Sequence, residues 1–310
     1  MITSEKLQCR LEQEHSNRIK APDEPKDNLK LVQNWIELES RSILHTHNNV
    51  DADAAFSAAL MILIRERIHG KNSTHLEFLP SDFPVESENS LGVDMMNGGN
   101  SIKGLGHGSA FGELVTIATK LKVIPHRLFI SFADQLNLTD SGKPCNDRIA
   151  LAGLTKSWKY AGLEDREIVS RAKEILNGMW IGKEKHYSRL KISNKIPIKN
   201  GIALNLHGGG VDRRTLSRRG ALLVINHHQD IGQSIILTPK GKKAKLDLND
   251  LTSTLPQSWF VHPTGWMACY GSLKAIKNPE NSGISLPELC MITHDWISKN
   301  IEINSTVVQE

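Results

Sequence analysis

The feature that most constrains this sequence is a short apolar segment that ends in ionisable side chains and passes directly into an apolar helix. Residues 43–47, Ile-Leu-His-Thr-His, predict a buried strand, and residues 54–68 are almost continuously apolar, which predicts a helix packed against a sheet. His47, Asp51 and Asp53 lie where the strand gives way to the helix. Open α/β sheets place their binding sites at the carboxyl ends of the strands. We therefore expect an α/β domain with a functional site at this junction.

The spacing of these three side chains, H-x-x-x-D-x-D, suits a hard divalent cation. Mn²⁺ and Mg²⁺ bind carboxylate oxygens together with a few imidazole nitrogens. A simpler interpretation is that Asn49 and Asp51 cap the following helix while His47 packs in the sheet. Capping accounts for one or two of these groups, whereas unpaired charge beside an apolar core is costly. The pattern therefore favours a metal site.

Later segments of the same region supply further candidates. Residues 75–79 and 90–94 predict two more strands, and the second ends in Asp94. The glycine-rich stretch that follows carries His107 and must be a loop, because glycine at this density is costly in a regular element. Ser109 then begins a helix.

Two more aspartates, Asp134 and Asp140, follow the apolar residues 128–132, for which a strand and a buried helical turn both remain open. From residue 149 to residue 180 the apolar period is mostly helical.

Composition excludes several classes of protein. The chain has 310 residues, 39% of them hydrophobic and 23% charged, which suits a folded protein of about two domains. Its net charge of +4 is only a mild preference for anionic partners. The four cysteines lack C-x-x-C spacing, which argues against a zinc ribbon or a disulfide framework. No apolar run suits a membrane span or a signal peptide, so we expect a cytoplasmic protein without a membrane partner.

The sequence also resembles a known family. Residues 47–54 resemble the first motif of the DHH phosphoesterase superfamily, a histidine followed by D-x-D at the start of a helix. Three later segments resemble its melanocyte proliferating gene type exonuclease branch and occur in the family order: residues 92–94, 132–142 and 259–266. The resemblance implies a phosphoesterase that uses Mn²⁺ or Mg²⁺, in that branch one that cuts RNA from the 3′ end. Its implied metal ligands are His47, Asp51, Asp53, Asp94, Asp134 and Asp140.

One family motif is missing or degenerate. The Asp-His-His triplet should follow Asp94, but residues 95–97 are Met-Met-Asn, and His107 is the imidazole that remains nearby. Residues 226–228, Asn-His-His, lie far downstream in a predicted hairpin, and we interpret them as a chance likeness. With this ligand set reduced, one metal or none must be considered beside two.

The chain divides into four predicted segments. The fold class that we expect is α/β, with a mainly parallel sheet and flanking helices, followed by a smaller α+β domain. The segments are a polar N-terminal extension (1–28), a DHH-like metal-binding catalytic domain (29–150), a helical connector (151–195) and a β-rich C-terminal domain (196–310). In the resembled family the second domain binds substrate.

Four residues of the C-terminal part are candidates for contacts with substrate. Arg213 and Arg214 follow a glycine-rich stretch and could neutralise phosphate, although an exposed, solvated turn explains them equally well. His262 and Gly265 belong to the segment that resembles the family's C-terminal signature, and a histidine satisfied within a strand is the alternative there. A lysine-rich turn is expected at residues 240–245.

The leading hypothesis is a metal-dependent phosphoesterase that hydrolyses a phosphodiester in RNA, an oligonucleotide or a nucleotide with metal-activated water. Asp94 and His107 are its catalytic candidates, and a cleft between the two domains would take the substrate. A second hypothesis is a catalytically impaired protein on the same scaffold that binds a nucleotide or a metal and acts in regulation. A nucleic-acid-binding module without chemistry fits less well, because basic and aromatic residues are too sparse. The sequence does not predict the oligomeric state.

Overall fold

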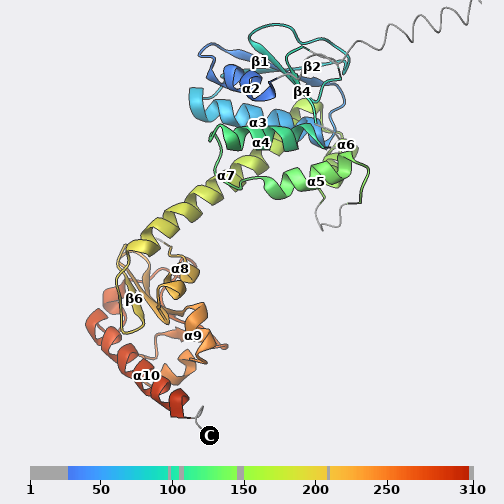
Figure 1. Ribbon diagram of the computed structural model, residues 1–310. Coiled ribbons are helices and arrows are strands. Elements are labelled where there is room, and N and C mark those ends of the chain that lie inside the picture. Colours follow the sequence, from blue (N-terminus) through green and yellow to red (C-terminus); the bar gives the residue numbers. More distant parts are fainter. Residues whose placement is uncertain (1–26, 97–98, 105–107, 145–149, 208–209, 307–310) are drawn as a thin grey trace, which may run out of the picture. The chain divides into compact units, whose positions relative to one another are not determined.

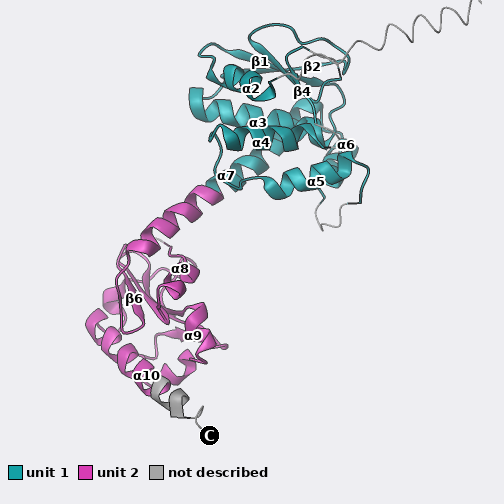
Figure 2. Ribbon diagram, in the orientation of Figure 1, with its two compact units in different colours: residues 1–181 teal, residues 182–310 magenta. Residues whose placement is uncertain are grey.

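The computed structural model describes residues 27–96, 99–104, 108–144, 150–207 and 210–306, of which 301–306 are described by their backbone alone. The chain forms two compact units, residues 1–181 and 182–310, which Figure 2 distinguishes. The boundary lies within one long helix, α7 (Asp165–Lys195), that belongs to the segment expected to connect the domains. The polar extension expected at residues 1–28 lies almost wholly outside the described residues.

The first unit contains a four-stranded parallel sheet (Figure 1). Its order is β2 (Thr74–Leu79), β1 (Ser42–His47), β3 (Ser90–Val93) and β4 (Ser101–Ile102). The register sets Leu44 between Leu76 and Leu91, and His47 opposite Leu79. Because all four strands run in one direction, their carboxyl ends meet at one edge of the sheet. The predicted α/β fold with a parallel sheet is confirmed.

Helix α3 (Ala52–His69) explains the apolar run after the first motif. Phe56, Leu60 and Ile64 are completely buried, because the helix packs against the sheet on one side and against other helices on the other. The Phe56 ring makes edge contacts with Phe111 and Phe132, whose ring centres lie 6.2 and 5.8 Å away. The surrounding helices of this unit are α2 (Asn28–Glu37), α4 (Ala110–Lys120), α5 (Ile130–Asp140) and α6 (Leu151–Tyr160). Residues 128–132, for which the sequence left a strand and a helical turn open, form a bend at residues 128–129 and the first turn of α5, so they are not a strand.

A buried arginine joins α3 to the segment that precedes β1. The side chain of Arg65 has no exposed surface, and its guanidinium carbon lies 5.1 Å from the centre of the Trp35 ring. Burial lowers the pKa of this arginine. The guanidinium donates hydrogen bonds to the carbonyl oxygens of Trp35 (2.7 Å), Ile36 (3.1 Å), Leu38 (2.9 Å) and Ser40 (2.9 Å). These bonds fix the connection from α2 to the strand that ends at His47.

The second unit contains a six-stranded mixed sheet. Its order is β5 (Ile198–Lys199), β6 (Ile202–Asn205), β7 (Leu223–His228), β8 (Gly232–Leu237), β10 (Met267–Tyr270) and β9 (Phe260–Val261). The pair β6 and β7 is parallel, and the other neighbouring pairs are antiparallel. The sheet is accompanied by α8 (Arg213–Arg218), α9 (Pro239–Lys243), α10 (Leu286–Thr306) and the 3₁₀ helices η1 (Leu248–Leu251) and η2 (Pro279–Asn281). The expected α+β second part is confirmed.

Alternate residues of β7 enter different cores. Leu223 and Ile225 join the core that contains Trp296 of α10, whereas Val224 joins a smaller core with Leu216 of α8. This follows from the period of two in a strand. The lysine-rich segment expected as a turn is instead α9, a short helix whose N-cap is Thr238. Within the described residues, no helix has the length and apolar character needed to cross a bilayer.

Candidate metal centre

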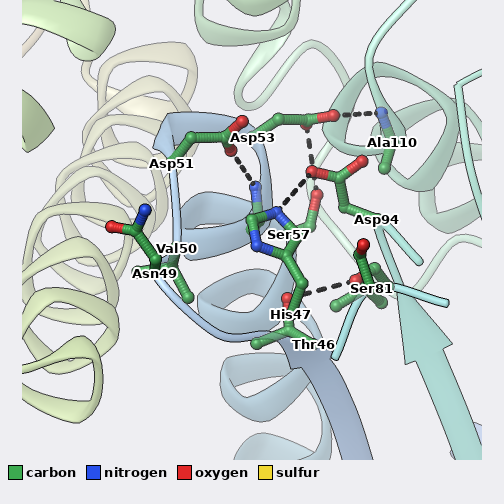
Figure 3. Close-up of polar contacts among 12 residues, drawn as sticks. Thr46, His47, Asn49, Val50, Asp51, Asp53, Ser57, Ser81, Asp94 and Ala110 are labelled. Carbon is green, nitrogen blue, oxygen red and sulfur yellow. Dashed lines mark hydrogen bonds and ion pairs between the residues drawn. The ribbon is translucent and has the colours of Figure 1, made fainter. Parts of the chain in front are cut away.

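Three side chains from two distant segments of the sequence converge at the carboxyl edge of the parallel sheet (Figure 3). His47 is the last residue of β1, Asp51 precedes α3, and Asp94 follows β3. One nitrogen or oxygen of each lies within 4.8 Å of the corresponding atoms of the other two. One imidazole with two carboxylates is a donor set that suits a hard divalent cation such as Mn²⁺ or Mg²⁺.

His47 is held with one ring nitrogen toward Asp94. Its Nδ1 lies 2.9 Å from the carbonyl oxygen of Asn48, which can only accept, so Nδ1 carries a proton. Its Nε2 lies 3.3 Å from Oδ2 of Asp94. The hydrogen bond to Asp94 outweighs desolvation and raises the pKa of His47 to about 9. A cation that displaced the proton on Nε2 would find a nitrogen and a carboxylate already aligned.

Asp94 adopts an uncommon backbone conformation. Its φ of 54° lies in the left-handed region, which is disfavoured for residues other than glycine, and its amide donates a hydrogen bond to the carbonyl of Ile102 at 2.9 Å. Such backbone strain is often found at functional sites.

One carboxylate oxygen of Asp51 caps a helix, and the other is available to bind a cation. Its Oδ1 accepts a hydrogen bond from the amide of Ala54 at 3.0 Å, which makes Asp51 the N-cap of α3. A carboxylate has a second oxygen that can bind elsewhere. Helix capping and metal binding, which the sequence presented as alternatives, are thus compatible at this residue.

Asp53 is used differently, because both of its oxygens bind the first turn of α4. Oδ2 accepts from the amide of Ala110 at 2.7 Å, and Oδ1 accepts from the amide of Phe111 at 2.8 Å. Burial, followed by the charges of Asp94 and Asp51, raises the pKa of Asp53 to about 7, although these two amides oppose the shift. Asp53 therefore links α3 to α4 and lies beside the group formed by His47, Asp51 and Asp94.

Of the other predicted ligands, Asp140 lies near the site and Asp134 has different surroundings. Asp140 lines a cavity of about 390 Å³ together with Asp51 and Asp53. Burial, with Asp94 and Asp51 nearby, raises the pKa of Asp140. Asp134 lines a different cavity, with Asn137 and Lys143 among its walls. His107 lies outside the described residues.

Two residues that the sequence analysis did not select hold the loop between the first two ligands. Asp165 accepts hydrogen bonds from the amides of Asn49 and Val50, at 2.7 and 3.0 Å. Lys159 donates to the backbone oxygen and the side-chain oxygen of Asn49, at 3.0 and 2.7 Å. The sequence indicates Asp165 only as an acidic residue in the first turn of a helix. Its contact with Asn49, more than a hundred positions earlier, has no signal in the sequence.

The second unit gathers positive charge around a cavity of about 560 Å³ that Arg189, Arg213, Arg214 and Lys242 line. Arg213 and Lys242 also lie over the ring of Trp266, at 5.2 and 5.4 Å from its centre. Two of the predicted substrate contacts, Arg213 and Arg214, are thus brought together.

The other two predicted contacts lie in the turn between β9 and β10. The His262 ring is 5.4 Å from that of Trp266, and its Nδ1 accepts a hydrogen bond from the amide of Thr264 at 3.2 Å. Gly265 has a φ of 56°, and a Cβ there would overlap the carboxylate of Asp247. Gly265 therefore has a packing function that requires glycine.

The sequence matches no protein-family model, and it matches none of the curated proteins. Among solved structures, it is similar to RecJ from Thermus thermophilus in complex with Mg²⁺ (12% identity, 93% of this chain, 54% of that chain, TM-score 0.29) and in complex with Mn²⁺ (12%, 93%, 55%, 0.31). It is also similar to an exonuclease RecJ bound to manganese (12%, 93%, 96%, 0.30). This chain thus spans about half the length of the two T. thermophilus chains.

Proposed function

We propose that this protein is a metal-dependent phosphoesterase of the DHH type. The observation that carries the proposal is the convergence of His47, Asp51 and Asp94, within 4.8 Å of one another, from two segments at one edge of a parallel sheet. These two segments are the ones whose sequences resemble the first two DHH motifs. Mn²⁺ is the preferred ion and Mg²⁺ the alternative, since the donor set is one nitrogen with carboxylate oxygens.

The surroundings of the three ligands suit hydrolysis of a phosphate ester. A bound divalent ion lowers the pKa of water and binds a phosphate oxygen. Asp94 would accept the proton of the attacking water, because its carboxylate lies beside the proposed ion. The cavity next to Asp51 has space for the phosphate ester group. His107, Asp134 and Asp140 remain candidates for the same site.

We further propose that the substrate is a phosphodiester in RNA or a short oligonucleotide, which the second unit binds through its cations. Arg213 and Arg214 would neutralise phosphate oxygens. His262 would donate a hydrogen bond from Nε2, since Nδ1 accepts one from Thr264. Trp266, which lies close to Arg213 and Lys242, would offer its ring for stacking with a base.

A regulatory protein that binds a nucleotide or metal without turnover is the alternative. Two observations favour it: Met95, Met96 and Asn97 stand where the family's triplet is expected, and both oxygens of Asp53 cap α4. Each of these reduces the number of ligands available for a second ion.

Metal dependence is the first test. Purified protein is incubated with end-labelled RNA, a dinucleotide or a generic phosphodiester, in Mn²⁺, in Mg²⁺ or in EDTA. We expect hydrolysis with Mn²⁺, none in EDTA, and recovery when Mn²⁺ is added back, because the ion activates the water. The position of the label gives the direction of cutting. Mn²⁺ binding without turnover of any substrate would support the regulatory alternative, and the absence of binding of both Mn²⁺ and Mg²⁺ would exclude the phosphoesterase.

The cations of the second unit give a separate prediction. Arg214 is exposed, so Arg214→Gln should remove charge without disturbing the fold. For an RNA substrate we expect KM to rise about fivefold with kcat unchanged. In a plot of log KM against the logarithm of the salt concentration, we expect the slope to decrease by roughly one, because one phosphate contact is lost. Arg171→Gln, an exposed change in the first unit, is the matched control. Equal KM values and salt slopes for the two variants would count against a substrate contact at Arg214.

A further inference from the structure

We propose that Lys159 and Asp165 are positioning residues that set the geometry of the metal-binding loop, residues 47–51. The inference rests on the proposed function, because it concerns how His47 and Asp51 are presented to a metal ion. Neither residue belongs to the group of proposed ligands. They act through Asn49 and Val50, which lie between the two ligands.

The middle of the loop has no bonds within the loop among the hydrogen bonds of the described residues, although its two ends are held by the contacts of His47 and Asp51. Only three residues separate His47 at the end of β1 from Asp51 at the start of α3. Asn49, in the middle, is exposed and has a φ of 57°, in the left-handed region. An exposed residue in this conformation has alternatives of similar energy, since asparagine is only several-fold enriched there. External contacts must therefore select the conformation that orients both ligands.

Lys159 and Asp165 supply those contacts from two directions. The two carboxylate oxygens of Asp165 accept one hydrogen bond each, from the amides of Asn49 (2.7 Å) and Val50 (3.0 Å). The ammonium of Lys159 binds the backbone oxygen of Asn49 (3.0 Å) and its side-chain oxygen (2.7 Å). The amide, the carbonyl and the side-chain amide of Asn49 are thereby each bound. Bonds that involve a charged group are the stronger kind of hydrogen bond.

The first turn of α7, which carries Asp165, is itself hydrogen-bonded to the sheet. Arg166, next to Asp165, donates a hydrogen bond to the carbonyl of Leu76 in β2 at 2.9 Å, and its guanidinium lies over the ring of Phe78. Asp165 lies in the first turn of α7, where the helix dipole favours a negative charge. The first turn of α7 is therefore hydrogen-bonded both to β2 and to the loop that follows β1. Through these bonds the position of the loop is fixed relative to the sheet.

Lys159 also lines the cavity beside Asp51, which raises the question of whether it binds substrate instead. Its contacts with Asn49 predict an effect on the metal. A substrate contact would change KM and leave metal affinity unchanged. Lys156 lines the same cavity one turn earlier in α6, and the structure gives it a contact with the ring of Tyr160 instead of the loop. The pair Lys159→Met and Lys156→Met therefore separates the two interpretations.

Titration with Mn²⁺ tests the proposal without substrate. In Asp165→Asn, the side chain keeps one acceptor, so either the Asn49 or the Val50 amide loses its partner. We expect Mn²⁺ affinity to fall about 10- to 100-fold in Asp165→Asn and about 10-fold in Lys159→Met, as for other residues that orient metal ligands. The double variant should lose less than the product of the two changes, because both act on Asn49. The paramagnetic resonance spectrum of bound Mn²⁺ at saturation should change in both single variants.

Matched controls are Glu174→Gln, which removes an exposed carboxylate of α7, and Lys156→Met. Both should bind Mn²⁺ with the affinity and spectrum of the unchanged protein. Melting curves confirm folding, and Lys159→Met keeps the test valid if Asp165→Asn is unfolded. Unchanged affinity and spectrum in the single variants would overturn the positioning role alone. If the unchanged protein binds no Mn²⁺, this inference and the proposed function both fall.

Discussion

Replacing Asp51 with asparagine should abolish Mn²⁺ binding and Mn²⁺-dependent hydrolysis while leaving the fold intact. The second oxygen of Asp51 is the proposed ligand, and the amide nitrogen that takes one oxygen position in asparagine cannot bind a cation. Asparagine is as good an N-cap as aspartate, so the hydrogen bond from the Ala54 amide can remain. We expect activity and metal affinity to fall by at least about 100-fold, since a direct ligand should matter more than a residue that orients one.

The matched control is Asp27→Asn, because Asp27 caps α2 through the same kind of bond, from the amide of Lys30 at 3.1 Å, and is not among the proposed ligands. Isothermal titration with Mn²⁺ and an assay with labelled RNA measure the two losses, and circular dichroism measures the fold. Mn²⁺ affinity and turnover that are equal in both variants would show that Asp51 only caps the helix.

Arg65→Met should strongly destabilise the first unit. Methionine fills much of the space but donates nothing, so the carbonyl oxygens of Trp35, Ile36, Leu38 and Ser40 would lose a buried partner. Each buried polar group left unpaired costs about 1–3 kcal/mol, although water can reach some of them. We expect the free energy of unfolding to fall by about 3–5 kcal/mol.

Differential scanning calorimetry is the suitable measurement, since it can resolve two units that unfold separately. Arg171→Met on α7 is the control, because Arg171 is exposed and forms an exposed ion pair with Glu174 at 3.5 Å, so its loss should cost less than about 0.5 kcal/mol. Arg65→Lys should lie between the two, since an ammonium offers fewer and less fixed donors than a guanidinium. An equal shift for Arg65→Met and Arg171→Met would refute the structural role of Arg65.

The sequence predicts those parts of the fold and of the site that depend on local patterns, such as the period of apolar residues and the polar residues at the end of a strand. The period and the polar ending of residues 43–47 predicted β1 and placed His47 at its carboxyl end, and the same rule placed Asp94 after β3. Once these strands are known to be parallel, their ends must meet at one edge, so the approach of His47 to Asp94 follows from the pattern.

The remaining features depend on contacts between distant segments. Asp53 fits the metal motif by spacing, but the first turn of α4, more than fifty residues later, takes both of its oxygens. Arg65 is hidden within an apolar run, and its position gives no sign that it would be buried. Lys159 and Asp165 reach Asn49 across more than a hundred residues, and no local period records such a pairing.

The hydrogen bond from Ala54 to Asp51 has a consequence for how an ion would be exchanged. His47 is anchored by Asn48, Asp51 by the start of α3, and Asp94 by its amide bond to Ile102, all through contacts that involve no cation. Little chain entropy is then lost when an ion enters, in contrast to small zinc domains that fold only around their metal. A divalent cation at this site would therefore bind to a preformed support and could be exchanged without unfolding of the protein. The ion bound would then depend on which divalent metal is abundant around the protein.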